Sequence, residues 1–188
     1  YFYNGSAAME KNEVGDASDA FNQGLRLATR NTELTSRILG KEAQLSLNEG
    51  KIEIGFAQFE KAINLEKSHP EVFNNYSLEL ALRKLNLEKA IALSEHLVSL
   101  DRSSTDYVFT RGFVLFQADQ FAEAENLLSR SMANTDFSPS GKILELYGDL
   151  LFKMNKPEEG LIQWQKAQSL GGGSDKLEQK IATKTYYE

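Results

Sequence analysis

The chain has 188 residues, of which 41% are hydrophobic, a length that suits one domain with a core and not two large domains. Its formal net charge is −6 and its acidic residues are scattered, so no basic stripe can neutralise a phosphate backbone and we expect no nucleic-acid partner. Cysteine is absent, which excludes disulfides and thiolate sites, and no apolar stretch reaches the roughly 18 residues of a membrane span, so we expect no direct membrane insertion of this segment.

Residue usage favours helix over sheet. The chain has only three prolines and 13 glycines, and it is rich in Leu, Ala, Glu, Lys and Gln. These straight side chains lose little rotamer freedom in a helix. We therefore predict an all-α fold.

The first 35 residues predict one helix pair, of which the first helix is weakly patterned. Residues 1–12 form this first helix in our interpretation, although their apolar spacing is poor. A turn at Gly15 and Asp16 then leads into a second helix that carries Phe21 and ends near Ala28. We call the first helix of each pair helix A and the second helix B.

A period close to 34 residues runs through the rest of the chain. Small residues occupy the same phase in successive A helices, at spacings of 34, 35 and 36 residues: Ala43, Ser77, Gly112 and Gly148. Each is followed by a turn and a related helix B, in residues 50–65, 87–100, 119–131 and 155–170. Such self-similarity is typical of repeat architectures.

A small residue in helix A, a Gly/Asp/Asn turn, and then a small residue, a large apolar residue and Ala in helix B resemble the signature of tetratricopeptide repeats. The resemblance implies a right-handed α-solenoid of antiparallel helix pairs. It divides the array of residues 1–173 into about five repeats, 1–35, 36–69, 70–104, 105–140 and 141–173, followed by a capping helix in residues 174–188. Two helices alone cannot bury their apolar sides, so the pairs must stack.

In the third of the four well-patterned repeats, the sequence predicts which residues lie where helices A and B cross. We expect Gly112 and Ala124 where helices A and B cross, with Leu115, Phe121 and Leu128 filling the space around them. Residues beyond the 34-residue period are expected in loops, at 85–87 inside a pair and at 138–140 between pairs.

The end of the array is marked by glycines. Gly171, Gly172 and Gly173 close the last repeat, and Ser174 or Asp175 caps a final helix that we expect to extend to about Tyr187. Leu177 and Ile181 lie four residues apart on one side of this helix, surrounded by Lys, Glu and Gln. We interpret it as a solvating cap for the last repeat.

Catalytic signals are weak. His69 precedes Pro70 and is expected in a turn between repeats, while His96 is expected to be exposed on a helix B, and neither has a sequence partner. The glycines match no phosphate-binding loop. We expect no enzyme activity, no cofactor and no metal site.

A surface for a partner is expected on the inner side of the A helices, which in tetratricopeptide proteins resembles a groove for extended or helical peptides. Single aromatics at helical spacing are most often core, which is the alternative for Phe109 and Phe116. Phe113 follows Gly112 and is rotated by about 100° from it, toward the concave side. The predicted partner-binding residues are Asn74, Asn75, Leu78, Phe109, Phe113, Phe116, Asp149 and Phe152.

We do not expect this groove to bind the terminal carboxylate of a chaperone tail. Chaperone-tail-binding tetratricopeptide domains hold a terminal carboxylate with Lys, Asn and Arg, and the equivalent positions here are Gly40, Asn74, Phe109 and Glu145. Lys41 and Arg37 lie near these positions without completing the pattern.

Residues 73–78, 86–90 and 181–188 also resemble the C-terminal parts of long tetratricopeptide proteins and lipoproteins of Bacteroidota-type bacteria. This resemblance implies a periplasmic or envelope protein, lipid-anchored through an N-terminal segment before Tyr1, with a cytoplasmic protein as the alternative. The predicted function is a non-enzymatic scaffold for a protein or peptide that supports envelope assembly or secretion. The alternative is a regulatory module that binds a short peptide or small ligand.

Overall fold

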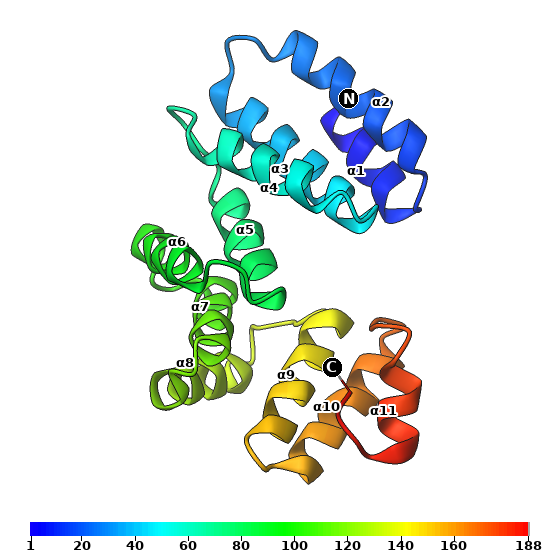
Figure 1. Ribbon diagram of the computed structural model, residues 1–188, viewed down its shortest axis with the longest axis vertical. Helices are drawn as coiled ribbons and strands as arrows, with labels where there is room; N and C mark the ends of the chain where they lie inside the picture. Colours follow the sequence, from blue (N-terminus) through cyan, green and yellow to red (C-terminus); the bar gives the residue numbers. More distant parts are fainter. Residues whose placement is uncertain (188) are drawn as a thin grey trace. The chain divides into compact units, whose positions relative to one another are not determined.

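The computed structural model describes residues 1–187, and all regular secondary structure in that range is helical (Figure 1). The order and bounds of the helices are α1 (Phe2–Glu10), α2 (Val14–Leu27), α3 (Thr32–Asn48), α4 (Ile52–Ile63), α5 (Pro70–Leu82), α6 (Leu87–Leu100), α7 (Thr105–Gln117), α8 (Phe121–Ala133), α9 (Gly141–Lys153), α10 (Pro157–Ser169) and α11 (Leu177–Thr183). The all-α prediction is confirmed.

Consecutive helices contact each other as five pairs, α1 with α2, α3 with α4, α5 with α6, α7 with α8 and α9 with α10. The chain divides into two compact units, Tyr1–Ala133 with the first four pairs and Asn134–Glu188 with the fifth pair and α11. Helix α3 begins at Thr32, so the expected repeat boundary between residues 35 and 36 lies inside this helix.

The turn inside every pair contains a residue with positive φ. These residues are Asn12 (60°), Gly50 (77°), Lys84 (51°), Asn86 (42°), Asp119 (60°) and Asn155 (60°). Left-handed backbone favours Gly, Asn and Asp, which explains why the sequence repeats these residue types at the turns. Helix starts are fixed by caps such as Asn31, whose side chain accepts a hydrogen bond from the Leu34 amide at 2.9 Å, and by Pro70 and Pro157 in the first turn.

Small residues lie at the helix crossings, as predicted. A Cβ added to Gly112 would lie 2.8 Å from Leu128 Cγ, and one added to Gly148 would lie 2.5 Å from Trp164 Cδ1. Ala43 and Ser77 are fully buried at the same phase. The close approach of helices A and B therefore depends on the absence of larger side chains here.

Two local predictions are wrong. Ala124, Leu115 and Leu128 are buried as expected, but Phe121, the first residue of α8, is 50% exposed. Its ring meets that of Phe116 at an angle of 64°, with centroids 5.4 Å apart. Helix α11 is shorter than the predicted Asp175–Tyr187 helix, since it covers only Leu177–Thr183 and the next residue, Lys184, has a φ of 51°.

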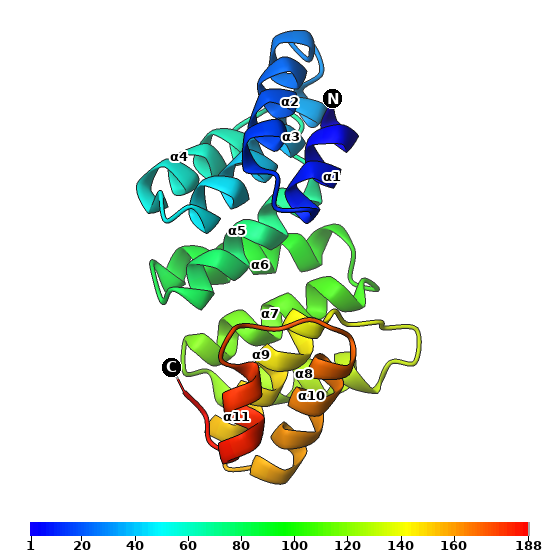
Figure 2. The ribbon, with the colours of Figure 1, turned by 90° about the vertical axis from the view of Figure 1, so that its right-hand side faces the viewer.

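The buried side of α11 also differs from the prediction. Leu177 is buried, but its buried neighbour is Lys180 and not Ile181, which is only partly buried. Neither Ser174 nor Asp175 is the N-cap residue, which is Lys176. Figure 2 shows α11 lying against α10 in the second unit.

Candidate functional site

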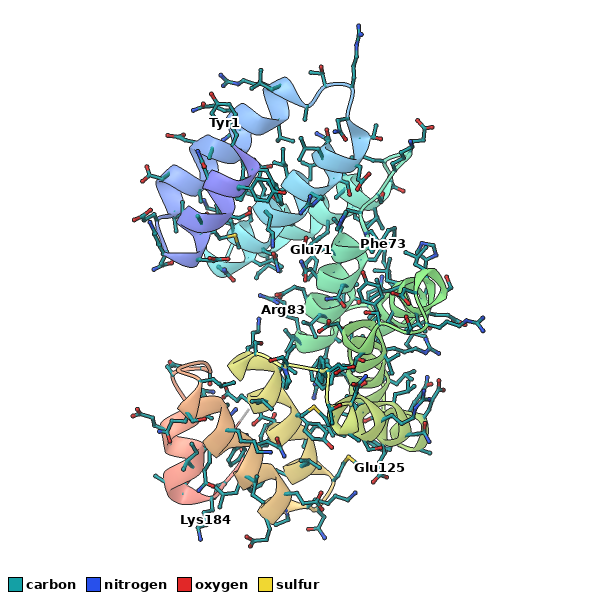
Figure 3. All side chains as sticks on the ribbon, turned by 180° about the vertical axis from the view of Figure 1, so that it is seen from behind. Tyr1, Glu71, Phe73, Arg83, Glu125 and Lys184 are labelled. Carbon is teal, nitrogen blue, oxygen red and sulfur yellow. The ribbon has the colours of Figure 1, made fainter. Side chains whose placement is uncertain are left out.

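Three of the predicted partner-binding residues form an accessible surface on α5. The adjacent residues Asn74 and Asn75 lie three and four residues after Glu71 and four and three residues before Leu78. All four therefore share one side of the helix. All four are half-buried. In Figure 3, Glu71 and Phe73 lie on opposite sides of α5. We call the side that carries Glu71, Asn74, Asn75 and Leu78 the α5 surface.

An ion pair connects the α5 surface to the neighbouring helix A. Lys41 Nζ on α3 lies 2.6 Å from Glu71 Oε1, and the two side chains are 23% and 36% exposed. Among the described residues, no donor reaches the buried oxygen Oδ1 of Asn74. The surface thus combines a charge pair, two amides and one apolar side chain. These groups suit the backbone and side chains of a peptide.

The two basic residues near this surface are held within the protein. Lys41 binds Glu71, and the Arg37 guanidinium lies 4.3 Å from the centre of the Phe2 ring on α1. A guanidinium at this distance from an aromatic face is attracted by the ring. Neither residue is therefore placed as a free cation for a terminal carboxylate.

The aromatic residues predicted on α7 are buried. Phe109 and Phe113 each expose 2% and Phe116 exposes 4%. The expectation that Phe113 faces an open side is wrong, because α7 contacts α5, α6 and α8 and so carries apolar residues all round. The core alternative holds for Phe109 and Phe116.

The predicted residues on α9 have partners inside the second unit. Phe152 stacks on Trp164 with ring centroids 4.0 Å apart and an angle of 10° between the rings. Both carboxylate oxygens of Asp149 lie 2.8 Å from Lys180 Nζ, and Oδ1 also accepts a hydrogen bond from Trp164 Nε1 at 3.0 Å. Glu145, one helical turn earlier, lies 2.7 Å from the same ammonium group.

These three charged groups form a buried network whose pKa values reflect their environment. Burial opposes the charge on Lys180, but its hydrogen bonds to Asp149 and Glu145 outweigh burial and raise its pKa. Burial dominates for Asp149 and raises its pKa despite the ammonium group. For Glu145, burial is outweighed by hydrogen bonds from Lys180 and Ser174, and its pKa is lowered. Lys180 therefore stays charged while docked.

A pocket of about 490 Å³ lies in the first unit where the chain passes from α4 to α5. Its lining is Glu33, Ile63, Leu65, Glu66, Lys67, Ser68, Pro70, Phe73, His96 and Leu100. His96 is exposed as predicted and meets Phe73 edge-on, with ring centroids 4.8 Å apart. This volume falls within the range of small-ligand sites. Sequence reasoning missed the pocket because its walls come from four separate segments.

His69 lies beside this pocket and caps α5. It is extended before Pro70, as expected for the turn, and its Nδ1 accepts a hydrogen bond from the Glu71 amide at 3.3 Å. Only a neutral imidazole can accept at Nδ1. Burial, with a smaller effect of Arg37, lowers the pKa of His69.

This cap predicts a pH dependence of stability. Since the folded pKa of His69 lies below its ordinary value of 6.5, the stabilisation is present above pH 6.5 and is lost as pH falls through the lowered value. The substitution His69→Asn keeps a side-chain cap that does not titrate. We expect the urea-unfolding free energy of the wild type to decrease relative to that of His69→Asn as pH is lowered from 7 to 5. Parallel pH profiles would show that the His69 cap does not titrate in this range.

Residues 1–187 contain no cluster of three or more His, Asp or Glu side chains suited to hold a metal ion. Among the described helices, none is long and apolar enough to cross a membrane.

Comparison with known proteins identifies the fold. No protein-family model matches the sequence, and no curated protein matches it. Solved structures do match. The protein TTC0263 from Thermus thermophilus, a tetratricopeptide repeat protein, is 17% identical with a TM-score of 0.74, and the match covers 96% of this chain and 94% of that one.

Two further matches are of the same kind. A tetratricopeptide repeat protein from Parabacteroides merdae is 15% identical, with a TM-score of 0.62 and coverage of 97% of this chain and 82% of that one. YrrB, described as a tetratricopeptide repeat protein with an unusual peptide-binding site, is 14% identical, with a TM-score of 0.56 and coverage of 95% and 88%. The chain therefore has a tetratricopeptide-like fold of stacked helix pairs.

Proposed function

We propose that the chain is a non-enzymatic scaffold that binds an extended peptide segment of another protein on the α5 surface. The observation that carries this proposal is the set of half-buried groups Asn74, Asn75 and Leu78 beside the Lys41–Glu71 pair. The Asn75 amide offers both donors and an acceptor to a peptide backbone, and Leu78 offers an apolar contact. The tetratricopeptide-like fold supports a binding role, as does the peptide-binding site described for YrrB.

The double substitution Asn74→Ala/Asn75→Ala tests this proposal. Peptides selected against the wild-type chain from a random display library serve as the probe. We expect the double variant to bind them at least about fivefold more weakly, because two amide contacts of about 0.5–1.5 kcal/mol each are lost. Isothermal titration calorimetry measures the change.

The matched control is Asn126→Ala on α8, where the asparagine is exposed and lies outside the α5 surface. It should bind the selected peptides like the wild type. Equal affinities of the double variant and the wild type, with unchanged melting curves, would remove the α5 surface from the proposal.

The pocket favours a second candidate function, a regulatory module for a small ligand. Its lining combines apolar side chains such as Phe73 and Leu100 with His96 and charged groups, which suits an apolar ligand that carries a polar group. Screening fragments by ligand-observed NMR against the wild type and Leu100→Asp tests it. Fragments that bind both chains alike, or none that bind, would reject this candidate.

We also propose that the scaffold acts in the bacterial envelope, in assembly or secretion. The resemblance of residues 73–78, 86–90 and 181–188 to Bacteroidota-type envelope proteins supports this. Fractionation of cells that express the full-length gene product tests it, and recovery in the cytoplasmic fraction alone would reject it.

A further inference from the structure

Helix α11 is attached to the second unit by a small set of contacts. It has seven residues, of which only Leu177 and Lys180 are buried, and Gly171–Gly173 precede it. Isolated helices of this length are not stable in water, so α11 depends on its docking. Segments with few buried apolar groups open at lower free energy than the core.

The docking site is built to receive an ammonium group. Lys180 Nζ contacts Glu145 at 2.7 Å and Asp149 at 2.8 Å, and it lies 5.7 Å from the centre of the Trp164 ring on α10. The Lys180 side chain is only 5% exposed. Two carboxylates and an aromatic face are the groups that recognise a lysine side chain.

Ser174 and Leu177, which lie six and three residues before Lys180, are also held in place. The Ser174 amide donates to Glu145 Oε2 at 2.5 Å and its hydroxyl to Glu145 Oε1 at 2.6 Å. Leu177 is 4% exposed and packs against Gly173, where an added Cβ would clash with it. The docked segment therefore has the pattern Ser-x-x-Leu-x-x-Lys, in which Ser174 and Lys180 bind carboxylates of α9 and Leu177 is buried.

We infer that α9 and α10 form a recognition site for segments of this pattern, that residues 174–180 occupy the site in cis, and that a lysine-bearing segment of another chain can displace them. Glu145 and Asp149 are four residues apart on one side of α9. When α11 leaves, these two like charges face each other without a cation, which favours replacement by another ammonium group. Because α11 is tethered, it competes at high effective concentration and keeps the site covered until the competing segment is abundant.

The inference concerns the second unit alone and stands apart from the α5 surface in the first unit, so either can fail without the other. Its partner is defined by chemistry, as a segment that places a serine, a leucine and a lysine at successive spacings of three. A second copy of this chain, which carries the same segment, is one source of such a ligand.

The test uses a synthetic peptide of residues 174–188 as the probe. We expect the full chain with Lys180→Met to bind this peptide, because its own α11 no longer fills the ammonium site. A peptide that itself carries Lys180→Met should bind at least about tenfold more weakly. Equal binding of both peptides, or no binding by a folded Lys180→Met chain, would overturn the inference.

Hydrogen exchange of the wild-type chain provides a second measurement that does not depend on how the variant folds. We expect the amides of α11 to exchange faster than those of α10, and millimolar wild-type peptide to speed their exchange further, whereas the Lys180→Met peptide leaves it unchanged. Exchange of α11 together with α10, unaffected by either peptide, would show that α11 is a fixed part of the fold. Exchange of α11 between two copies, seen as a dimer in light scattering, would support the inference with the second copy as ligand.

Discussion

The substitution Trp164→Ala should destabilise the second unit by about 3–5 kcal/mol, the usual cost of removing a large buried aromatic side chain. Trp164 is fully buried, stacks on Phe152 and donates a hydrogen bond to Asp149. It also packs directly against Gly148, where helices α9 and α10 cross. A unit of about 55 residues is expected to have a stability of only about 3–8 kcal/mol. The variant is therefore expected to lose much of the folded second unit.

Circular dichroism during urea unfolding measures this effect, because Trp164 is the only tryptophan and its fluorescence disappears with the substitution. The matched control is Ile162→Ala on the same helix, where the side chain is 49% exposed. Its stability should change by less than about 0.5 kcal/mol. A Trp164→Ala chain as stable as this control would contradict the packing of α9 on α10.

The substitution Gly112→Leu should destabilise the first unit by about 1–3 kcal/mol or more, since overpacking a tight crossing displaces its neighbours. The added Cβ alone would lie 2.8 Å from Leu128 Cγ and 3.1 Å from Leu127 Cβ. The control Gly15→Leu on α2 places its Cβ in open space. Because leucine is a better helix former than glycine, this control should be neutral or more stable. Thermal melting of both variants measures these effects, and we expect a lower melting temperature for Gly112→Leu and an equal or higher one for Gly15→Leu.

Features that recur with the repeat could be predicted from the sequence. The small residues at 43, 77, 112 and 148 and the Gly, Asn or Asp turns each solve the same local problem in every pair, namely close helix approach or left-handed backbone. Repetition makes such positions visible without any knowledge of the fold. The helix pairs and their crossings follow from these signals.

Features that occur once could not be predicted in this way. Lysine is almost never fully buried unless it is paired, so the sequence alone favours the solvent side of α11 for Lys180. Its partners Glu145 and Asp149 lie 35 and 31 residues earlier, and no local pattern connects them to it. For Phe113, the helical phase gives its direction on α7 but not its burial, which depends on the elements packed around that helix.

The central claim is that the α5 surface holds a peptide, and the absence of native cysteine allows a direct measurement. A single thiol introduced by Asn75→Cys lies on this surface, and one introduced by Asn126→Cys lies on α8. With saturating selected peptide, we predict that thiol labelling slows at least about tenfold at position 75 and stays unchanged at position 126. Labelling of Asn75→Cys at the same rate with and without the bound peptide would contradict a binding role for the α5 surface.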